Sequence, residues 1–318
     1  MVKRASLRKA ALEWKISMSN DVSCIINPKA AQQKWFKNKR LRDYLKEQFP
    51  GRIYDERDSK EKTIQLAREV SQKQKVVIAV GGDGTMADVL QGIVEARREK
   101  DVLFGIIPFG SGNAFRRSLS IPLNVRRAVR ILYEGNTKEI DLIEIEGKVA
   151  GIASVGAIAE LTHEALKENT TSLYGHLKQS RKVFSISKSE QDIELFDGID
   201  DEGNHFEKKD LRLQLLDCVI AKTNYFGYGW RIAPKAKLDD GYLDITFFEI
   251  SAFKYLLCLP LIFFGLYQKT QRHFKAKKMI IKGKGLHIQY NGEYLGTRDR
   301  IEMKVIPRAV KVICPLNK

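Results

Sequence analysis

Small and acidic residues follow an apolar, strand-like run in the first third of the chain. Residues 76–80 are Val, Ile and Ala, and they lead into Gly81-Gly82-Asp83-Gly84-Thr85. Glycines at such a turn let backbone N–H groups reach phosphate oxygens without a Cβ in the way, and a following helix N-terminus adds partial positive charge. The carboxylate of Asp83 is unfavourable beside a phosphate unless it takes up a proton, holds Mg²⁺ or orders donors. The motif therefore predicts phosphate binding with a chemical role, although a tight strand-to-helix connection is an equal alternative.

A second loop of the same type follows the apolar run at residues 103–107, and its sequence is Pro108-Phe109-Gly110-Ser111-Gly112-Asn113. Two such loops at the ends of neighbouring parallel strands would frame one crevice at the carboxyl edge of a sheet. Neither loop is a Walker A motif, because Gly-Lys-Ser/Thr is absent, and the first turn has no Gly-x-Gly-x-x-Gly dinucleotide fingerprint.

These two loops, preceded by Ile26-Asn27-Pro28, resemble the diacylglycerol kinase catalytic-domain family, which includes bacterial soluble lipid kinases and sphingosine kinases. The resemblance continues at Ala233-Pro234-Lys235-Ala236, at residues 239–244 and at Asn291-Gly292-Glu293, so it spans roughly residues 22 to 313. It implies an ATP-dependent lipid kinase that transfers the γ-phosphoryl group to the hydroxyl of a diacylglycerol-like or sphingoid lipid alcohol.

The resemblance also implies a set of site residues. The nucleotide would be held by Asn27, Gly81, Gly82, Asp83, Gly84, Thr85, Met86, Ala87, Gly110, Ser111, Gly112 and Asn113. The general base would be Glu293, ranked first, or Asp83, which we expect to be essential either way. For Glu293 the alternative is a polar residue in a hairpin turn, since Asn-Gly is a strong turn signal.

A metal site follows from the same resemblance. A structural Mg²⁺ would be bound by the carboxylate of Asp240 and the backbone carbonyls of Lys237 and Tyr242, in addition to the Mg²⁺ that accompanies ATP.

The chain departs from the family pattern in ways that leave the lipid acceptor open. Ala114 and Asn291 stand where the family often has aspartate. Gly-Ser-Gly-Asn-Ala occurs in sphingosine kinases, but Thr162 stands where those enzymes place the acid that reads the sphingoid amine, with Glu160 as a substitute.

The order of elements predicts two domains. Strand-like runs at 22–26, 76–80 and 103–107 alternate with helical patterns at 35–48, 60–72, 85–97 and 125–133, which indicates an α/β nucleotide-binding domain with a parallel sheet. Later runs at 140–145, 149–155, 211–221, 242–248, 279–281, 286–290 and 301–305, with helical insertions at 159–167 and 173–184, indicate an antiparallel β-rich, sandwich-like domain.

We therefore expect a basic N-terminal extension at residues 1–20, the α/β domain at 21–138, a β-rich lipid-substrate domain at 139–307, and a last strand at 308–318 that returns to the first domain. The resemblance places the active site in the cleft between the domains.

Composition fits a globular protein of the cytoplasm. Its 318 residues are 43% hydrophobic and 30% charged, enough to form two cores. The four cysteines are scattered and lack Cys-x-x-Cys pairing, so we expect free thiols in a reducing compartment and no zinc site.

The net charge of +16 favours anionic membrane surfaces or polyphosphates, and nucleic acid is not expected because basic clusters are not interleaved with stacking aromatics. Residues 255–267 form an apolar stretch too short to span a bilayer and run into a basic segment. Docking on an anionic bilayer, giving peripheral membrane association, and a buried core helix are equal interpretations. The basic segment 1–19 is not a secretory signal and is either a membrane-surface helix or a frayed extension.

Two other classes compete with the lipid kinase. NAD kinases share the Gly-Gly-Asp-Gly-Thr turn, but their second motif is Asn-Glu. A non-catalytic membrane-binding module is the other alternative, motivated by the charge and by Ala114 and Asn291.

Overall fold

A computed structural model describes residues 21–28, 35–54, 59–110, 114–167, 186–227 and 229–316. They form two compact units: one holds the chain up to Ile140 and again from Arg308, and the other holds Asp141–Pro307. Two expectations, the extension at 1–20 and the helix at 173–184, lie outside the described residues.

The sheet of the first unit consists of parallel strands in the order β2-β1-β3-β4, followed by the end of β13. The strands are β1 (Val22–Ile26), β2 (Ile53–Tyr54), β3 (Val76–Gly81), β4 (Leu103–Pro108) and β13 (Glu293–Ile313), of which the last runs on from the second unit. Register pairs Ile26 with Val80 and Val80 with Ile107, so the carboxyl ends of β1, β3 and β4 lie side by side. Both faces of β3 are buried, which explains its unbroken run of apolar residues.

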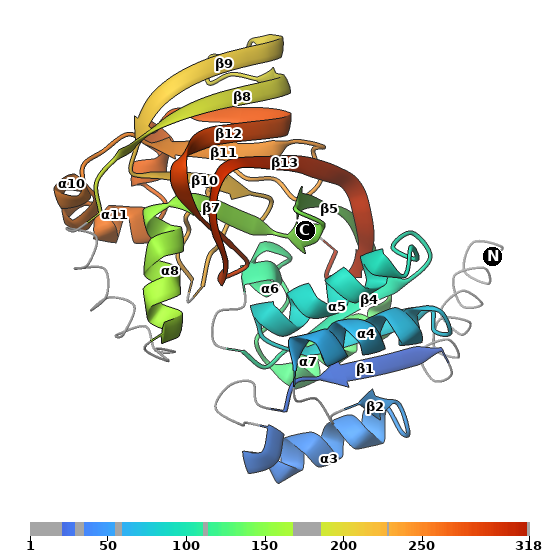
Figure 1. Ribbon diagram of the computed structural model, residues 1–318. Coiled ribbons are helices and arrows are strands. Elements are labelled where there is room, and N and C mark those ends of the chain that lie inside the picture. Colours follow the sequence, from blue (N-terminus) through green and yellow to red (C-terminus); the bar gives the residue numbers. More distant parts are fainter. Residues whose placement is uncertain are drawn as a thin grey trace. The chain divides into compact units, whose positions relative to one another are not determined.

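Helices cover both faces of this sheet (Figure 1). They are α3 (Lys39–Gln48), α4 (Lys60–Ser71), α5 (Asp83–Glu95), α6 (Ala114–Ser118) and α7 (Val125–Glu134). Residues of α3 and α7 pack on the face that carries Ile78 and Val80, and α4 packs closely against α5, where a Cβ at Gly92 would lie 2.5 Å from Ala67 Cβ. The helix predicted over 35–48 is interrupted at Asn38, because its side chain accepts a hydrogen bond from Leu41 N and caps α3.

The second unit is built mainly from antiparallel strands, which apart from β6 are labelled in Figure 1. They are β5 (Thr137–Ile145, which begins in the first unit), β6 (Lys148–Ala150), β7 (Ile152–Gly156), β8 (Ser189–Ile199), β9 (His205–Leu215), β10 (Asp217–Ala221), β11 (Leu243–Phe248) and β12 (His273–Tyr290) with most of β13. β11 pairs with both β10 and β12, and β7 also pairs with both, so these four strands form a closed ring of pairings. The runs predicted at 279–281 and 286–290 belong to one continuous strand, and so do those at 301–305 and 310–314.

The apolar stretch at 255–267 folds into short helices, α10 (Ala252–Leu257) and α11 (Leu259–Phe263), followed by the 3₁₀ turn η2 (Tyr267–Thr270). One side of this pair is core, since Tyr255 and Ile262 are buried. The other side exposes large apolar side chains, which are Phe253, Leu257, Leu261, Phe264 and Leu266. Among the described residues no helix is long and apolar enough to cross a bilayer.

Candidate active site

The first glycine loop connects β3 directly to α5. Gly82 is the N-cap of α5, and among the described residues no side chain caps this helix end. The amide groups of its first turn can therefore bind an anion, with the positive end of the helix dipole behind them. Gly81 is required by packing, because a Cβ there would lie 2.3 Å from Thr85 Oγ1.

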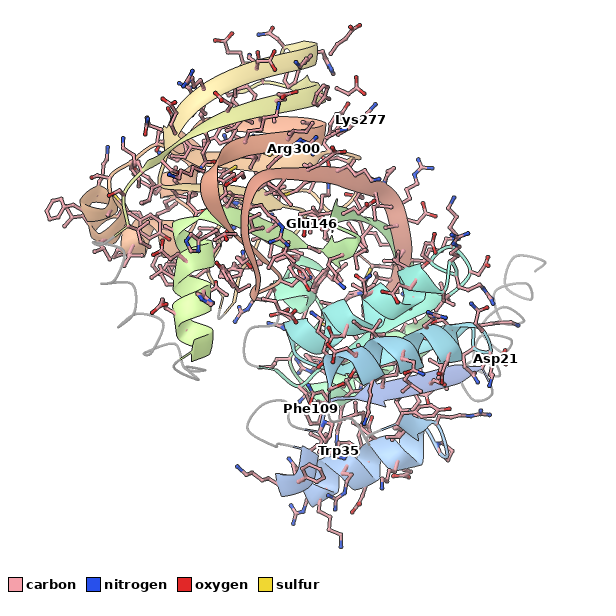
Figure 2. All side chains as sticks on the ribbon, viewed as in Figure 1. Asp21, Trp35, Phe109, Glu146, Lys277 and Arg300 are labelled. Carbon is pink, nitrogen blue, oxygen red and sulfur yellow. The ribbon has the colours of Figure 1, made fainter. Side chains whose placement is uncertain are left out.

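The second loop lies against the first. Phe109 N and Gly110 N donate hydrogen bonds to Gly81 O at 2.8 and 3.1 Å. A Cβ on Gly82 would lie 3.2 Å from Gly110 Cα, so the two backbones touch. Phe109 is buried against Trp35, with ring centroids 6.4 Å apart, and both residues are labelled in Figure 2. This packing fixes the loop beside the open end of α5.

Asp83 connects the two loops. Its Oδ1 accepts a hydrogen bond from Phe115 N, in the first turn of α6, at 3.3 Å. The carboxylate thus lies between the N-terminal ends of α5 and α6, where both helix dipoles favour its charge. Its position is compatible with a structural role, a chemical role, or both.

The structure describes most of the other nucleotide-binding candidates. Asn27 N donates to Val80 O at 3.3 Å, so Asn27 lies at the same sheet edge as the glycine loops. Thr85, Met86 and Ala87 are buried in the first turns of α5, so the latter two can offer a ligand their backbone alone. Gly84 has open space beside its Cα, and Ser111, Gly112 and Asn113 lie outside the described residues.

In the second unit, Glu293 begins β13 directly after a tight turn. Tyr290 Oη donates a hydrogen bond to Glu293 Oε2 at 3.2 Å. The turn is held by Asn291, whose Oδ1 accepts from Gly151 N at 2.9 Å and whose Nδ2 donates to Val149 O at 3.1 Å. An aspartate could accept the first bond but could not donate the second. Asparagine therefore suits this position, and the turn that it holds fixes the backbone at Glu293.

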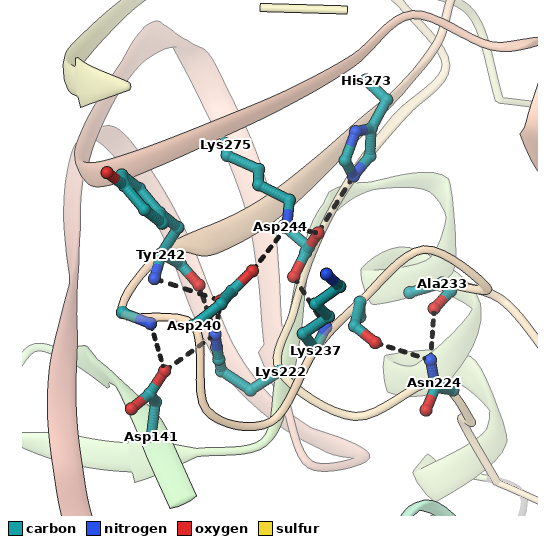
Figure 3. A network of polar contacts seen from close by, with 12 residues as sticks. Asp141, Lys222, Asn224, Ala233, Lys237, Asp240, Tyr242, Asp244, His273 and Lys275 are labelled. Carbon is teal, nitrogen blue, oxygen red and sulfur yellow. Dashed lines mark hydrogen bonds and ion pairs between the residues drawn. The ribbon is translucent and has the colours of Figure 1, made fainter. Parts of the chain in front are cut away.

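A partly buried cluster of charged side chains surrounds the loop that was expected to bind Mg²⁺ (Figure 3). Asp240 binds Lys222 Nζ at 2.7 Å and Lys275 Nζ at 2.5 Å, and Tyr242 O accepts from Lys222 Nζ at 2.5 Å. Lys237 N donates to Asp244 at 3.0 Å. The described residues contain no group of three or more His, Cys, Asp or Glu side chains arranged to hold a metal ion.

These contacts shift the pKa values of Asp240 and Lys275. Burial opposes the charge of Asp240, but the hydrogen bonds from Lys222 and Lys275 outweigh it and hold the pKa of this carboxyl below its usual value. Burial would lower the pKa of Lys275, but Asp240 and Asp244 more than offset it and raise that pKa. Because Lys222 already bonds two of the three groups assigned to the structural Mg²⁺, the donors as they stand do not fit a divalent cation. Sequence reasoning missed Lys222, whose one signal is a lysine at the end of a buried apolar strand.

Comparisons with known proteins identify two domains in this chain. Residues 21–145 match the family described as the diacylglycerol kinase catalytic domain, and residues 199–314 match the YegS C-terminal NAD kinase beta sandwich-like domain. Residues 21–145 of this chain are therefore a diacylglycerol kinase catalytic domain.

Two bacterial proteins are among its relatives. A protein named diacylglycerol kinase from Staphylococcus saprophyticus is 28% identical over 239 residues, which is 74% of this chain and 75% of that protein. One of the same name from Staphylococcus aureus is 28% identical over 190 residues, which is 59% of this chain and 57% of that protein. A crystal structure of a diacylglycerol kinase from Bacillus anthracis str. Sterne shares the fold, with a TM-score of 0.69 at 19% identity over 93% of this chain and 97% of that one.

Proposed function

We propose that this protein is an ATP-dependent lipid kinase that transfers the γ-phosphoryl group to the hydroxyl of a lipid alcohol. The observation that carries the proposal is the contact between Gly82 and Gly110 at the open N-terminus of α5, because it forms a backbone cradle for phosphate groups. The relatives named diacylglycerol kinase favour a lipid acceptor over NAD.

In this proposal the first unit binds ATP. The amides of Gly82, Gly84 and the first turn of α5 hold phosphate oxygens, with Ser111, Gly112 and Asn113 assigned to the same nucleotide by family resemblance. Mg²⁺ enters with the nucleotide and screens the charge of the phosphates. Asp83 orients the loops through Phe115 N and presents a carboxylate beside the phosphates and their Mg²⁺.

The second unit supplies the proposed general base. The acceptor hydroxyl attacks the γ-phosphorus and gives its proton to the carboxylate of Glu293, while the bond between the γ-phosphorus and the bridging oxygen breaks and ADP leaves. The products are a phosphorylated lipid and ADP. Tyr290 donates to Glu293 Oε2 and so fixes the carboxylate for proton transfer.

The exposed apolar side of α10 and α11 supports peripheral membrane association. Leu257 is 66% exposed and Phe264 is 63% exposed, while Lys254 and Arg231 are exposed on the same helices and the adjoining loop. Apolar side chains flanked by cations are what binding to an anionic bilayer requires. The surface would bring the enzyme to the leaflet that holds its acceptor.

The test is transfer of radiolabelled γ-phosphate from Mg·ATP to a panel of lipid alcohols in anionic mixed micelles. Glu293→Gln should abolish labelling of the accepted lipid. Glu302→Gln is the matched control, because Glu302 lies on the same strand and pairs with Lys278 and Arg300 at the surface. Label on NAD and on no lipid would overturn the lipid assignment.

A further inference from the structure

The side chain of Lys222 carries a fully bonded ammonium group in the interior of the second unit. The residue follows β10, and its side chain is 0% exposed. Nζ lies 3.1 Å from Asp141 Oδ2, 2.7 Å from Asp240 Oδ1 and 2.5 Å from Tyr242 O. An ammonium group has three N–H donors, and each has an acceptor here.

The surrounding loop depends on this positive charge. Asp141 Oδ2 also accepts from Gly241 N at 2.7 Å, and Asp240 Oδ1 accepts from Tyr242 N at 3.3 Å. Lys222 therefore joins β5 to the loop at residues 239–242 through two carboxylates and one carbonyl (Figure 3). Without the ammonium group between them, the buried carboxylate of Asp141 would lose its cation, and it would repel the partly exposed Asp240, which keeps Lys275 alone.

The cluster also reaches the turn that carries Glu293. Lys222 N donates to Gly151 O at 2.8 Å, and Gly151 N donates to Asn291 Oδ1 at 2.9 Å. Gly151 is thus shared between the residue that organises the acidic loop and the residue that holds the turn before Glu293.

We infer that Lys222 is a built-in cation that takes the place of a structural divalent metal at the loop of Asp240 and Tyr242. The carboxylate and carbonyl that would ligate Mg²⁺ bind the ammonium group instead, and Lys275 neutralises the second oxygen of Asp240. The loop is therefore assembled without a metal ion. This inference goes beyond the proposed kinase activity and does not depend on it.

The experiment is thermal unfolding without nucleotide, in EDTA and in millimolar Mg²⁺. The wild-type protein should have the same Tm in both. Lys222→Ala should unfold about 10 °C lower in EDTA, because the buried Asp141 loses its cation and Asp240 loses one of two, and should recover part of that loss in Mg²⁺, which fits the vacated space. Lys222→Met is the matched control: it removes the charge but fills the space, so its Tm should fall without metal recovery.

A second measurement keeps the inference testable if Lys222→Ala does not fold. Mn²⁺ is added to the protein without nucleotide and followed by electron paramagnetic resonance. Any signal of bound Mn²⁺ in the wild-type protein should be unchanged in Asp240→Asn. A bound signal removed by Asp240→Asn, or a wild-type Tm that rises with Mg²⁺, would overturn the inference. So would equal Mg²⁺ responses of Lys222→Ala and Lys222→Met. None of these readouts requires kinase activity, so failure of the proposed function would be recognised separately.

Discussion

Tyr290 and Glu293 lie on either side of a two-residue turn, and the tyrosine hydroxyl donates a hydrogen bond to the glutamate carboxylate at 3.2 Å. A charge-assisted bond of this kind is worth about 1.5–3 kcal/mol and restricts the carboxylate to one orientation. The turn between them is fixed independently by Asn291, so removal of the hydroxyl should change the orientation of Glu293 without unfolding the hairpin.

Tyr290→Phe should therefore lower kcat about tenfold and leave the KM for ATP unchanged. Steady-state kinetics with a saturating lipid acceptor measures this. Tyr294→Phe is the comparison, since Tyr294 Oη binds His287 Nδ1 at 2.8 Å. Equal kcat values for wild type and Tyr290→Phe would exclude a positioning role for the hydroxyl.

Replacement of Asp83 should separate its structural role from its charge. Asp83→Asn keeps an oxygen that can accept from Phe115 N, so we expect a Tm close to that of the wild type with kinase activity reduced more than a hundredfold. Asp83→Ala removes the acceptor as well and should be less stable by about 1 kcal/mol. Full activity of the asparagine variant would show that the charge has no chemical role.

Glycines of the first loop should differ in their tolerance of a methyl group. Gly82→Ala places a Cβ 3.2 Å from Gly110 Cα and should push the two loops apart, with weaker ATP binding by isothermal titration calorimetry. Gly84→Ala meets nothing within 4 Å, and alanine favours a helix by about 1 kcal/mol over glycine, so the Tm should hold or rise. Equal ATP affinity of Gly82→Ala and wild type would contradict the cradle.

Replacement of the buried Asp217 should increase the stability of the protein in a pH-dependent way. Desolvation raises the pKa of its carboxyl well above the usual value, against hydrogen bonds from Ile158 N and Cys218 N. A raised folded-state pKa means that stability is full below about pH 4, the unfolded value, and is lost as pH rises toward the folded pKa. Asp217→Asn should therefore raise the Tm at pH 8 more than at pH 5. A uniform loss at both values would show that the carboxyl is not a source of pH-dependent instability.

The exposed side of α10 and α11 should bind membranes. The double variant Leu257→Glu with Phe264→Glu should lose more than tenfold in sedimentation with phosphatidylglycerol vesicles, because each inserted apolar side chain contributes roughly 1.5–3 kcal/mol. Leu123→Glu is the control, since Leu123 is 57% exposed in the first unit. Unchanged binding of the double variant would place the membrane contact elsewhere.

The glycine loops could be located from sequence because their signals are local. A buried strand reads as an unbroken apolar run, and glycines mark the point where the backbone turns, as at Gly81 and Gly110. The apolar run at 255–267 could not be assigned to the core or to the surface because it contributes to both. Tyr255 and Ile262 are buried in the core, while Leu257 and Phe264 are exposed.

Other features depend on distant partners. β8 was not predicted, because Glu190, Asp192 and Glu194 alternate with its apolar residues and are stabilised by Arg212, Lys208 and Lys282 on the flanking strands. Lys222 was missed because its acceptors Asp141 and Asp240 come from residues far from it in the sequence. The contribution of a buried lysine to stability depends on its partners, which no local sequence pattern reveals.

The last residues of β13 pair in parallel with β4, at Lys311 with Leu103 and Val312 with Phe104. The sheet of the first unit is therefore closed by a segment that the ribosome makes after the whole of the second unit. In a nascent chain that has emerged only as far as Ile140, the edge of β4 that pairs with β13 has unpaired backbone groups and can associate with other chains. The nucleotide-binding half of this protein can complete its fold only after the residues that follow Arg308 have been made, and truncation before Arg308 should yield a protein prone to aggregate.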